Sequence, residues 1–317
     1  MDVLAEMLAS LRLSGGVFVD GEFAAPWSVQ SHFTPDDCAP FFTPPPQLIA
    51  YHYVRSGALT CAVAGGGPVV EVAAGEIVLL PQNVPHCLHG PRPWPRVIDP
   101  GAMFREVTSE GRLRVRGGGT GARTAIYCGY LGTNTPDHML LQSLPPVLVI
   151  GADATAGDWI VKSLDFAVRG LCGNSPEMVG KLAECLFAEA VRGYVAALPA
   201  DERGWLAGLR DPAVGKALAL IHRRYAEAWT LDQLAREAGV SKTVLADRFR
   251  ALIGEAPMQY CARWRMKVAA GMLRDNRQNA CSVAYSVGFN SEAAFSRAFK
   301  REYGIPPATW RRELIAA

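Results

Sequence analysis

The chain has 317 residues, about twice the usual length of one compact domain, so we expect two domains that each bury a core. Half of the residues are hydrophobic and 20% are charged, and no apolar run approaches the roughly 20 residues of a membrane span, which excludes an integral membrane protein. The start, Met1 to Glu6, resembles no secretory signal, and the eight cysteines form no C-x-x-C pair. We therefore expect a cytoplasmic protein with reduced thiols and without membrane partners.

The net charge of +2 conceals two halves of opposite sign. Residues 1–210 hold 15 Lys and Arg against 20 Asp and Glu, a net charge of −5. Residues 211–317 hold 17 against 10, a net charge of +7. A basic C-terminal third beside an acidic body is typical of a nucleic-acid-binding module attached to another domain.

The first part of the chain, residues 1–155, is predicted to be a β domain. Short β-rich runs are separated by Gly and Pro, and they lie at 17–19, 48–54, 58–63, 69–72 and 76–80. Many short strands with turn residues between them indicate a small barrel or jelly roll.

Two segments of this domain resemble the two cupin motifs. The run from Gly75 to His86 has the spacing of the second motif, with Asn83 where a glycine is usual. The segment His52–Gly57 takes the place of the first motif, but Val54 replaces its second histidine and no carboxylate follows. The resemblance implies a cupin fold whose catalytic metal set is incomplete.

Imidazole and thiol groups in this domain could still bind zinc if they converge. The candidate ligands are His52, His86, His89 and Cys128. Cys87 directly follows His86, so it should point to the opposite side of a strand. The alternative is that all of these residues are structural members of a β core.

An arginine-rich stretch, residues 96–123, follows the second cupin-like motif. It contains six arginines and the run Gly117 to Gly121, which lacks the surroundings of a phosphate-binding loop. We expect a long solvated connection. The alternative is a lid that recognises an anionic effector through guanidinium groups.

Residues 156–205 are predicted to form a helical dimerisation and linker segment. Ser175 and Pro176 are a helix-start signal, and an apolar stripe follows. Its members are Val179, Leu182, Leu186, Ala190 and Tyr194. The stripe fits packing on the barrel or pairing with a second subunit, and we favour a homodimer. The domain boundary should lie between Leu198 and Asp211.

The basic third, residues 211–317, contains an internal repeat. Seven like residues recur at an offset of 50, from Leu245 matching Phe295 to Tyr260 matching Trp310. Upstream, the turn glycines Gly239 and Gly288 are 49 apart. Each copy has the small residue, turn glycine and apolar anchor of a helix-turn-helix, and Pro257 to Leu273 predicts one long helix between the copies. Two recognition helices held apart in this way could enter major-groove segments about 34 Å apart.

This C-terminal part resembles the AraC/XylS family of transcription regulators. The resemblance rests on the sequence from Leu234 to Ser241 and on the signature from Val287 to Arg311. Asp2 to Phe18, Ala25 to Trp27 and Tyr127 to Tyr130 also resemble the cupin-type sensor domains of one subgroup. The resemblance implies a C-terminal all-α domain with two helix-turn-helix motifs, promoter DNA and RNA polymerase as partners, and a small-molecule effector.

The residues expected at DNA lie at the start and on the outward face of each recognition helix. They are Ser241, Lys242, Thr243, Ala246, Asp247 and Arg250 in the first copy, and Ser291, Glu292, Ala293, Ser296, Arg297 and Lys300 in the second. The resemblance places base contacts at Thr243, Ala246 and Asp247, and Arg297 is the best candidate for a bidentate contact to guanine. We expect the first copy to be the weaker reader.

Three functions are compatible with these observations. The leading hypothesis is a non-enzymatic regulator whose DNA binding responds to an effector in the cupin-like domain. The competing hypothesis is a metal-dependent cupin enzyme fused to a helix-turn-helix domain, which the degenerate first motif disfavours. A DNA-repair alkyl acceptor would require a zinc-bound cysteine cluster that the cysteine spacings do not offer. The effector, the operator and the direction of regulation stay open.

Overall fold

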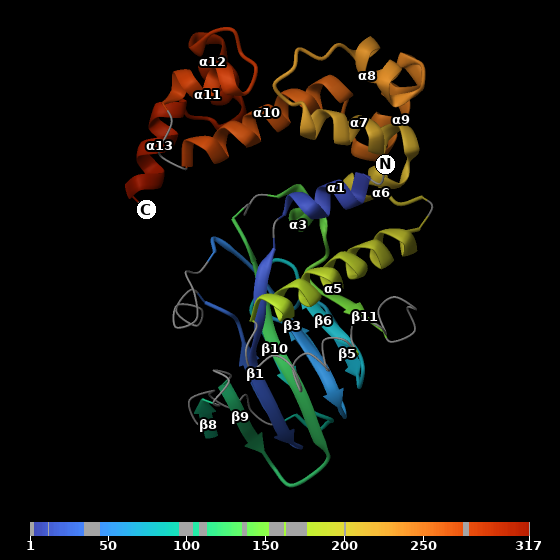
Figure 1. Cartoon of the computed structure of the whole chain (residues 1–317), viewed down its shortest axis with the longest axis vertical. Helices are drawn as coiled ribbons and strands as arrows, with labels where there is room; N and C mark the ends of the chain where they lie inside the picture. Colours follow the sequence, from blue (N-terminus) through green and yellow to red (C-terminus); the bar gives the residue numbers. More distant parts are fainter. Residues whose placement is uncertain are drawn as a thin grey trace. The chain divides into compact units, whose positions relative to one another are not determined.

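The protein divides into two compact units, which are described separately. The computed structural model describes residues 3–11, 13–34, 45–94, 104–107, 113–134, 138–151, 162, 176–199, 201–274 and 279–316 (Figure 1). One unit is Leu8–Ala197, and the other is Leu198–Ala317 together with Met1–Met7. Helix α6 (Trp205–Arg210), which precedes the expected start of the DNA-binding domain at residue 211, therefore belongs to the C-terminal unit.

The first unit is built from two β-sheets. The larger sheet has the order β11 (Leu148–Ile150), β6 (Ile77–Leu80), β3 (Gln47–Ser56), β10 (Arg123–Thr133), β1 (Ser14–Ala24), β9 (Leu113–Gly118) and β8 (Phe104–Val107). The smaller sheet has the order β2 (Ser28–Ser31), β7 (His86–His89), β4 (Ala58–Val63) and β5 (Val69–Ala73). The strand-rich cupin-like fold predicted from the sequence is confirmed.

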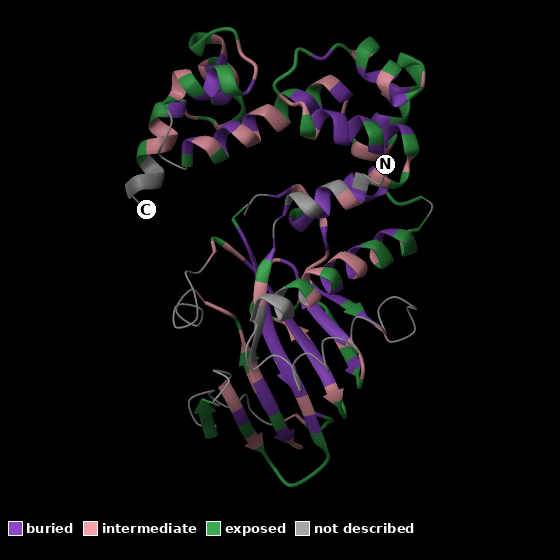
Figure 2. Cartoon of the chain, viewed as in Figure 1, coloured by how far each residue is buried: buried purple, intermediate pink, exposed green. Residues whose placement is uncertain are grey.

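The core of this unit takes apolar side chains from both sheets. Val54 and Ile126 of the larger sheet share one buried cluster with Leu59 and Leu88 of the smaller sheet. Trp27 is fully buried and stacks on Phe23, with ring centroids 4.6 Å apart. Figure 2 shows the buried middle of the long strands, which end in exposed residues. The two sheets therefore share one apolar core, as alternating strands predict.

The arginine-rich stretch, residues 96–123, was expected to be a long connection, but part of it forms strands. Residues 104–107 and 113–118 are the strands β8 and β9, and β9 pairs in parallel with β1. Arg116 forms an ion pair with Glu22 (3.1 Å), and Arg114 lies 3.9 Å from Asp20. A connection without secondary structure is therefore wrong for these residues, because β9 pairs with β1 and β8 pairs with β9. The expected solvent exposure holds for β8, whose residues are all exposed. Arg96 and Arg112 lie outside the described residues.

In the described residues of this unit, the helices are α3 (Met139–Ser143) and α5 (Pro176–Ala197), and α1 (Val3–Ser10) runs across the division between Met7 and Leu8. Helix α5 packs on β1. Its side chains Leu186, Phe187, Ala190 and Val191 are buried within this chain. The central part of the apolar stripe therefore covers the protein's own barrel, which was one of its two predicted roles. The homodimer stays a prediction, and its subunits would have to meet through residues other than the buried ones of α5.

The second unit is entirely helical in its described residues. After α6 come α7 (Pro212–Arg223), α8 (Leu231–Ala238), α9 (Lys242–Ile253), α10 (Pro257–Arg274), α11 (Ala280–Ser286), α12 (Glu292–Tyr303) and α13 (Pro307–Ala316). Helices α8 and α9 form the first helix-turn-helix, α11 and α12 form the second, and α10 runs between them (Figure 1). The predicted double motif and its long spacer helix are confirmed. Within the described residues, no helix combines the length and apolar character that a membrane span requires.

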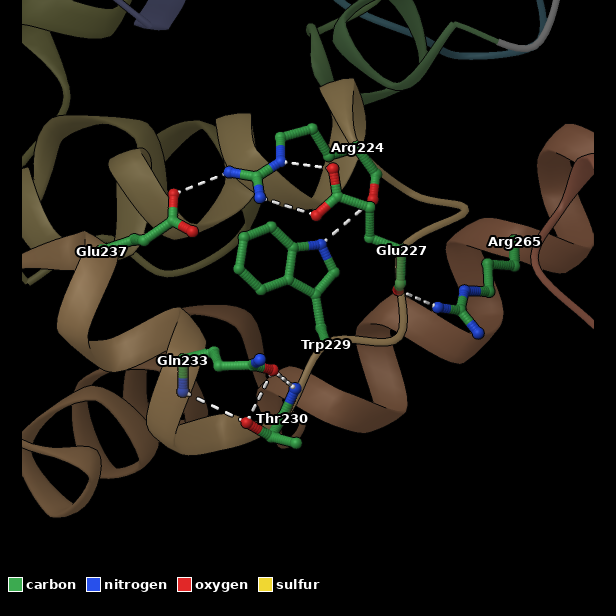
Figure 3. Close-up of polar contacts among 7 residues, drawn as sticks. All are labelled: Arg224, Glu227, Trp229, Thr230, Gln233, Glu237 and Arg265. Carbon is green, nitrogen blue, oxygen red and sulfur yellow. Dashed lines mark hydrogen bonds and ion pairs between the residues drawn. The ribbon is translucent and has the colours of Figure 1, made fainter.

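Polar side chains fix where these helices begin. The Asp211 carboxylate accepts from the backbone N–H groups of Ala213 and Val214, both at 2.9 Å. Thr230 and Gln233 form a capping box, in which each side chain bonds the other residue's backbone N–H (Figure 3). Ser241 and Ser291 cap the two recognition helices. These caps satisfy N–H groups that a helix start leaves without partners.

Replacing Thr230, which caps the start of α8, should lower the stability of the first helix-turn-helix. Thr230→Ala removes the side-chain acceptor at the start of α8, so the free energy of unfolding should fall by about 1 kcal/mol. The measurement is a chemical denaturation curve in which tryptophan fluorescence reports unfolding. Thr243→Ala, at an exposed position inside α9, is the control and should change stability by less than about 0.5 kcal/mol. Equal losses in both variants would contradict the capping role.

Candidate functional site

The first recognition helix, α9, is held by one buried face. Leu245 and Phe249 are fully buried, and the ring of Phe249 meets that of Tyr260 edge to face, with centroids 5.5 Å apart. The opposite side of the helix therefore faces solvent, because residues four apart share a face. Thr243 and Asp247 are exposed there, and Ala246 is half-buried.

The second recognition helix, α12, repeats this arrangement with larger anchors. Phe295 and Phe299 are fully buried, and Phe299 also contacts the ring of Trp310. Glu292, Ala293 and Arg297 are exposed, while Ser296 is half-buried. Apart from the half-buried Ala246 and Ser296, the residues expected at DNA are exposed.

The two outward faces differ in charge. On α9, Lys242 lies 3.5 Å from Asp232, and Arg248 lies 3.3 Å from Asp211. Lys242, Asp232 and Arg248 are exposed and Asp211 is half-buried, so these pairs weaken but do not abolish the positive potential. On α12, the cations Arg297, Lys300 and Arg301 form no ion pair with any described residue. The second helix therefore offers more uncompensated positive charge to a phosphate or a guanine.

A second group of functional residues meets inside the barrel. Three of the four candidate metal ligands come together, from β3, β7 and β10. The Nε2 atoms of His52 and His86 are 2.7 Å apart, and His52 Nδ1 is 2.8 Å from the Sγ atom of Cys128. All three side chains are buried. The register of β10 against β3 places Cys128 directly opposite His52.

The hydrogen bonds of this group fix where its protons lie. His86 Nδ1 donates to the carbonyl of Val84 (2.8 Å), so the Nε2 atom of neutral His86 is an acceptor. His52 therefore donates from Nε2, and its Nδ1 atom accepts from the Cys128 thiol. The three groups form a neutral chain in which every donor has an acceptor.

Burial keeps this chain uncharged. It lowers the pKa of His86 to about 4, against the opposing effect of the Val84 carbonyl. Burial, together with the neighbouring His86, lowers the pKa of His52 well below its usual range. Burial also raises the pKa of the Cys128 thiol. At neutral pH the group therefore presents imidazoles and a thiol, without a thiolate.

The four candidate zinc ligands do not converge on one point. His52 turns different nitrogens toward His86 and Cys128, so the three donor atoms do not point at one centre. His89 is elsewhere: its Nδ1 atom contacts Ser28 Oγ, and its ring stacks on Trp94. No three His, Cys, Asp or Glu side chains in the described part of the chain form a metal-binding group. A zinc site would require the His52 ring to turn, and elemental analysis of the purified protein tests it.

The cupin-like turn has one residue in an unusual conformation. Asn83 has φ +50°, a left-handed value that explains why glycine is usual at this position of the motif. Its side chain compensates by bonding the backbone of Phe33, donating to the carbonyl at 2.7 Å. The ring of Phe33 in turn stacks near His52, with centroids 6.4 Å apart. Sequence spacing located this turn but could not reveal its contact with Phe33.

Comparisons with known proteins agree with both parts of this description. A cupin family model matches residues 2–196, and a helix-turn-helix domain model matches residues 234–313. A putative AraC-like transcription regulator of Streptomyces lividans is 33% identical over 84% of this chain and 88% of its own length. The chain belongs to the AraC-like family of transcription regulators. The resemblance predicted from the sequence is confirmed.

Other relatives of this AraC-like regulator extend over its whole length. The transcriptional regulator MtrA of Neisseria gonorrhoeae is 24% identical, with 99% of both chains covered. Among solved structures, ToxT of Vibrio cholerae O395 matches with a TM-score of 0.37 and 11% identity, covering 96% of this chain and 99% of its own. The Streptomyces relative and the two domain models together show that this protein is a transcription regulator with a cupin domain and a helix-turn-helix domain.

The buried histidines of the regulator predict a specific pH dependence of stability. The unfolded chain binds a proton at His86 near pH 6.5, whereas the folded chain does so only near pH 4. Stability should therefore fall as the pH drops below about 6.5. Between about pH 7.5 and pH 5 the loss in wild type should exceed that in His86→Gln by about 2 kcal/mol. Denaturant titrations at each pH measure it, and parallel pH profiles would contradict a buried neutral His86.

Proposed function

We propose that this regulator binds promoter DNA in a sequence-specific manner through α9 and α12, and that a small molecule in the barrel controls this binding. The observation that carries the proposal is the pair of recognition helices with buried anchors and exposed polar faces. Such helices enter the major groove of DNA. RNA polymerase as a partner and a homodimeric state remain predictions from the family resemblance.

The second helix should be the main base reader. A guanidinium group recognises the O6 and N7 atoms of guanine through two parallel hydrogen bonds, and Arg297 is exposed and free of ion pairs among the described residues. On α9, Ala246 offers only a methyl contact, and Asp247 accepts only from cytosine or adenine amino groups. The first helix should therefore contribute more to placement than to discrimination between sequences.

Control by an effector requires a binding linkage between the two units. The barrel encloses a hydrogen-bonded chain of His52, His86 and Cys128 within apolar walls, which would suit a compact ligand that replaces some of these bonds. A ligand that binds one state of the regulator better than the other changes its DNA affinity by the same coupling free energy. The competing cupin-enzyme hypothesis has less support, because the named relatives are transcription regulators.

Selection of DNA from a random pool tests the proposal directly. The full chain is incubated with random duplexes at low and moderate salt, with and without cell extract, and the bound fraction is sequenced. We expect an enriched motif, and extract that contains the effector should change the yield of bound DNA. Failure to enrich any motif under both salt conditions would contradict sequence-specific binding.

Two arginine variants then separate base reading from phosphate binding. Arg297→Ala should relax specificity at one base position and cost about 1–3 kcal/mol on the selected operator. Arg301→Ala, one turn further along α12, is the matched control and should weaken binding uniformly across sequences. Quantitative binding to the operator and to its single-base variants measures both effects. A uniform loss in Arg297→Ala would assign Arg297 to the DNA backbone.

A further inference from the structure

The loop between α7 and α8, Arg224–Trp229, is called the bridging loop below. Its first residue fastens it to the first helix-turn-helix. The Arg224 guanidinium bonds both carboxylate oxygens of Glu227 at 2.6 Å and reaches Glu237 of α8 at 2.7 Å (Figure 3). It also lies over the ring of Trp229, whose indole N–H donates to the carbonyl of Arg224 at 3.1 Å. The loop is therefore folded on itself and attached to α8.

The same loop also touches the second helix-turn-helix. The side chain of Tyr225 packs against the core that contains Phe295 and Phe299 of α12. The next residue, Ala226, meets the turn of the second motif. A Cβ atom built on Gly288 would lie 2.1 Å from the carbonyl oxygen of Ala226, so the two backbones are in direct contact.

A single side chain of the spacer helix secures the loop between the two motifs. Arg265 of α10 donates from Nε to the carbonyl of Tyr225 at 2.6 Å. It also donates from Nη2 to the carbonyl of Glu227 (Figure 3). These two carbonyls flank Ala226, and the Glu227 carbonyl also accepts from the backbone N–H of Trp229 at 2.8 Å. A charged donor makes such bonds stronger than a neutral one does.

The internal repeat shows that this contact is not required by the turn itself. Gly239 and Gly288 occupy equivalent turns, with φ of +84° and +81°. Their N–H groups bond equivalent carbonyls, those of Arg236 and Tyr285. Yet nothing lies within 4 Å of a Cβ atom built on Gly239. Both glycines adopt a left-handed backbone conformation, but of the two only Gly288 contacts the bridging loop.

We propose that the bridging loop is a brace that sets the orientation of α12 relative to α9, with Arg265 and Gly288 as its positioning residues. The spacer α10 joins the two motifs along its own axis, so without the loop only side-chain packing would limit the rotation of one motif relative to the other about that axis. The bridging loop adds a second point of attachment, away from the axis of α10. The proposal rests on the proposed function, because its consequence is a fixed spacing between the two DNA segments that one chain reads.

The spacing between these segments is the readout that a merely structural role would not change. Each inserted base pair turns the next groove segment by roughly 35° about the DNA axis, from about 10–10.5 base pairs per turn. The probe is the duplex recovered from the random pool, together with versions that have one base pair added or removed between its two contacted segments. Wild type should lose about tenfold in affinity on the altered duplexes, since DNA or protein must deform.

Two variants weaken the brace by different means. Gly288→Ala adds a methyl group that collides with the Ala226 carbonyl, and Arg265→Met removes both loop hydrogen bonds while keeping the length of the side chain. Both should bind the original duplex more weakly, and the spacing penalty should shrink to less than about threefold. Arg265→Lys should restore part of the penalty, because it keeps one charged donor.

Two matched control variants distinguish the loss of the bridging-loop contacts from a general loss of stability. Gly239→Ala carries the same left-handed strain without a collision, and Arg263→Met removes another guanidinium from α10, one that pairs with Glu255. Both should keep the wild-type spacing penalty. A full penalty in Arg265→Met would overturn the brace even if Gly288→Ala fails to fold, and so would a wild type indifferent to spacing. If no motif is recovered from the pool, the proposed function falls, and the brace falls with it.

Discussion

The burial of two side chains on each recognition helix is the constraint on which the DNA-binding unit depends. Leu245 and Phe249 on α9, and Phe295 and Phe299 on α12, are fully removed from solvent. Because each pair is one helical turn apart, it decides which side of the helix faces outward. Neither helix can rotate to present another side without exposing its anchors. The chemistry of DNA reading is therefore left to the few residues on the opposite side.

Within this shared frame, the two copies have diverged in charge and in contacts. The cations of α9 are partly compensated by Asp232 and Asp211, whereas those of α12 are uncompensated among the described residues. The turn of the first copy is open, and that of the second touches the loop before α8. From these differences we expect the second copy to discriminate between sequences more strongly than the first. The barrel unit adds a neutral, fully hydrogen-bonded polar chain of His52, His86 and Cys128.

Local signals in the sequence were sufficient for most of this architecture. The repeat, the turn glycines and the serine caps are set by neighbouring residues, so the double motif could be predicted. The alternation at Leu113 to Arg116 is a strand signal that the surrounding glycines obscured, and only pairing with β1 makes the strand. His89 could not be separated from His52 by spacing, because strand register decides it. The contact of Gly288 with Ala226 has no local signal, since it joins segments that are distant in the sequence.

The central claim is that one chain presents two fixed recognition helices to one face of the DNA. Hydroxyl-radical and methylation protection of the selected operator, at a protein concentration that gives one bound chain, tests it most directly. The account predicts two protected major-groove segments about 10 base pairs apart on the same face, with guanine protection strongest under α12. A single protected segment per chain, or two segments at variable separation, would contradict it.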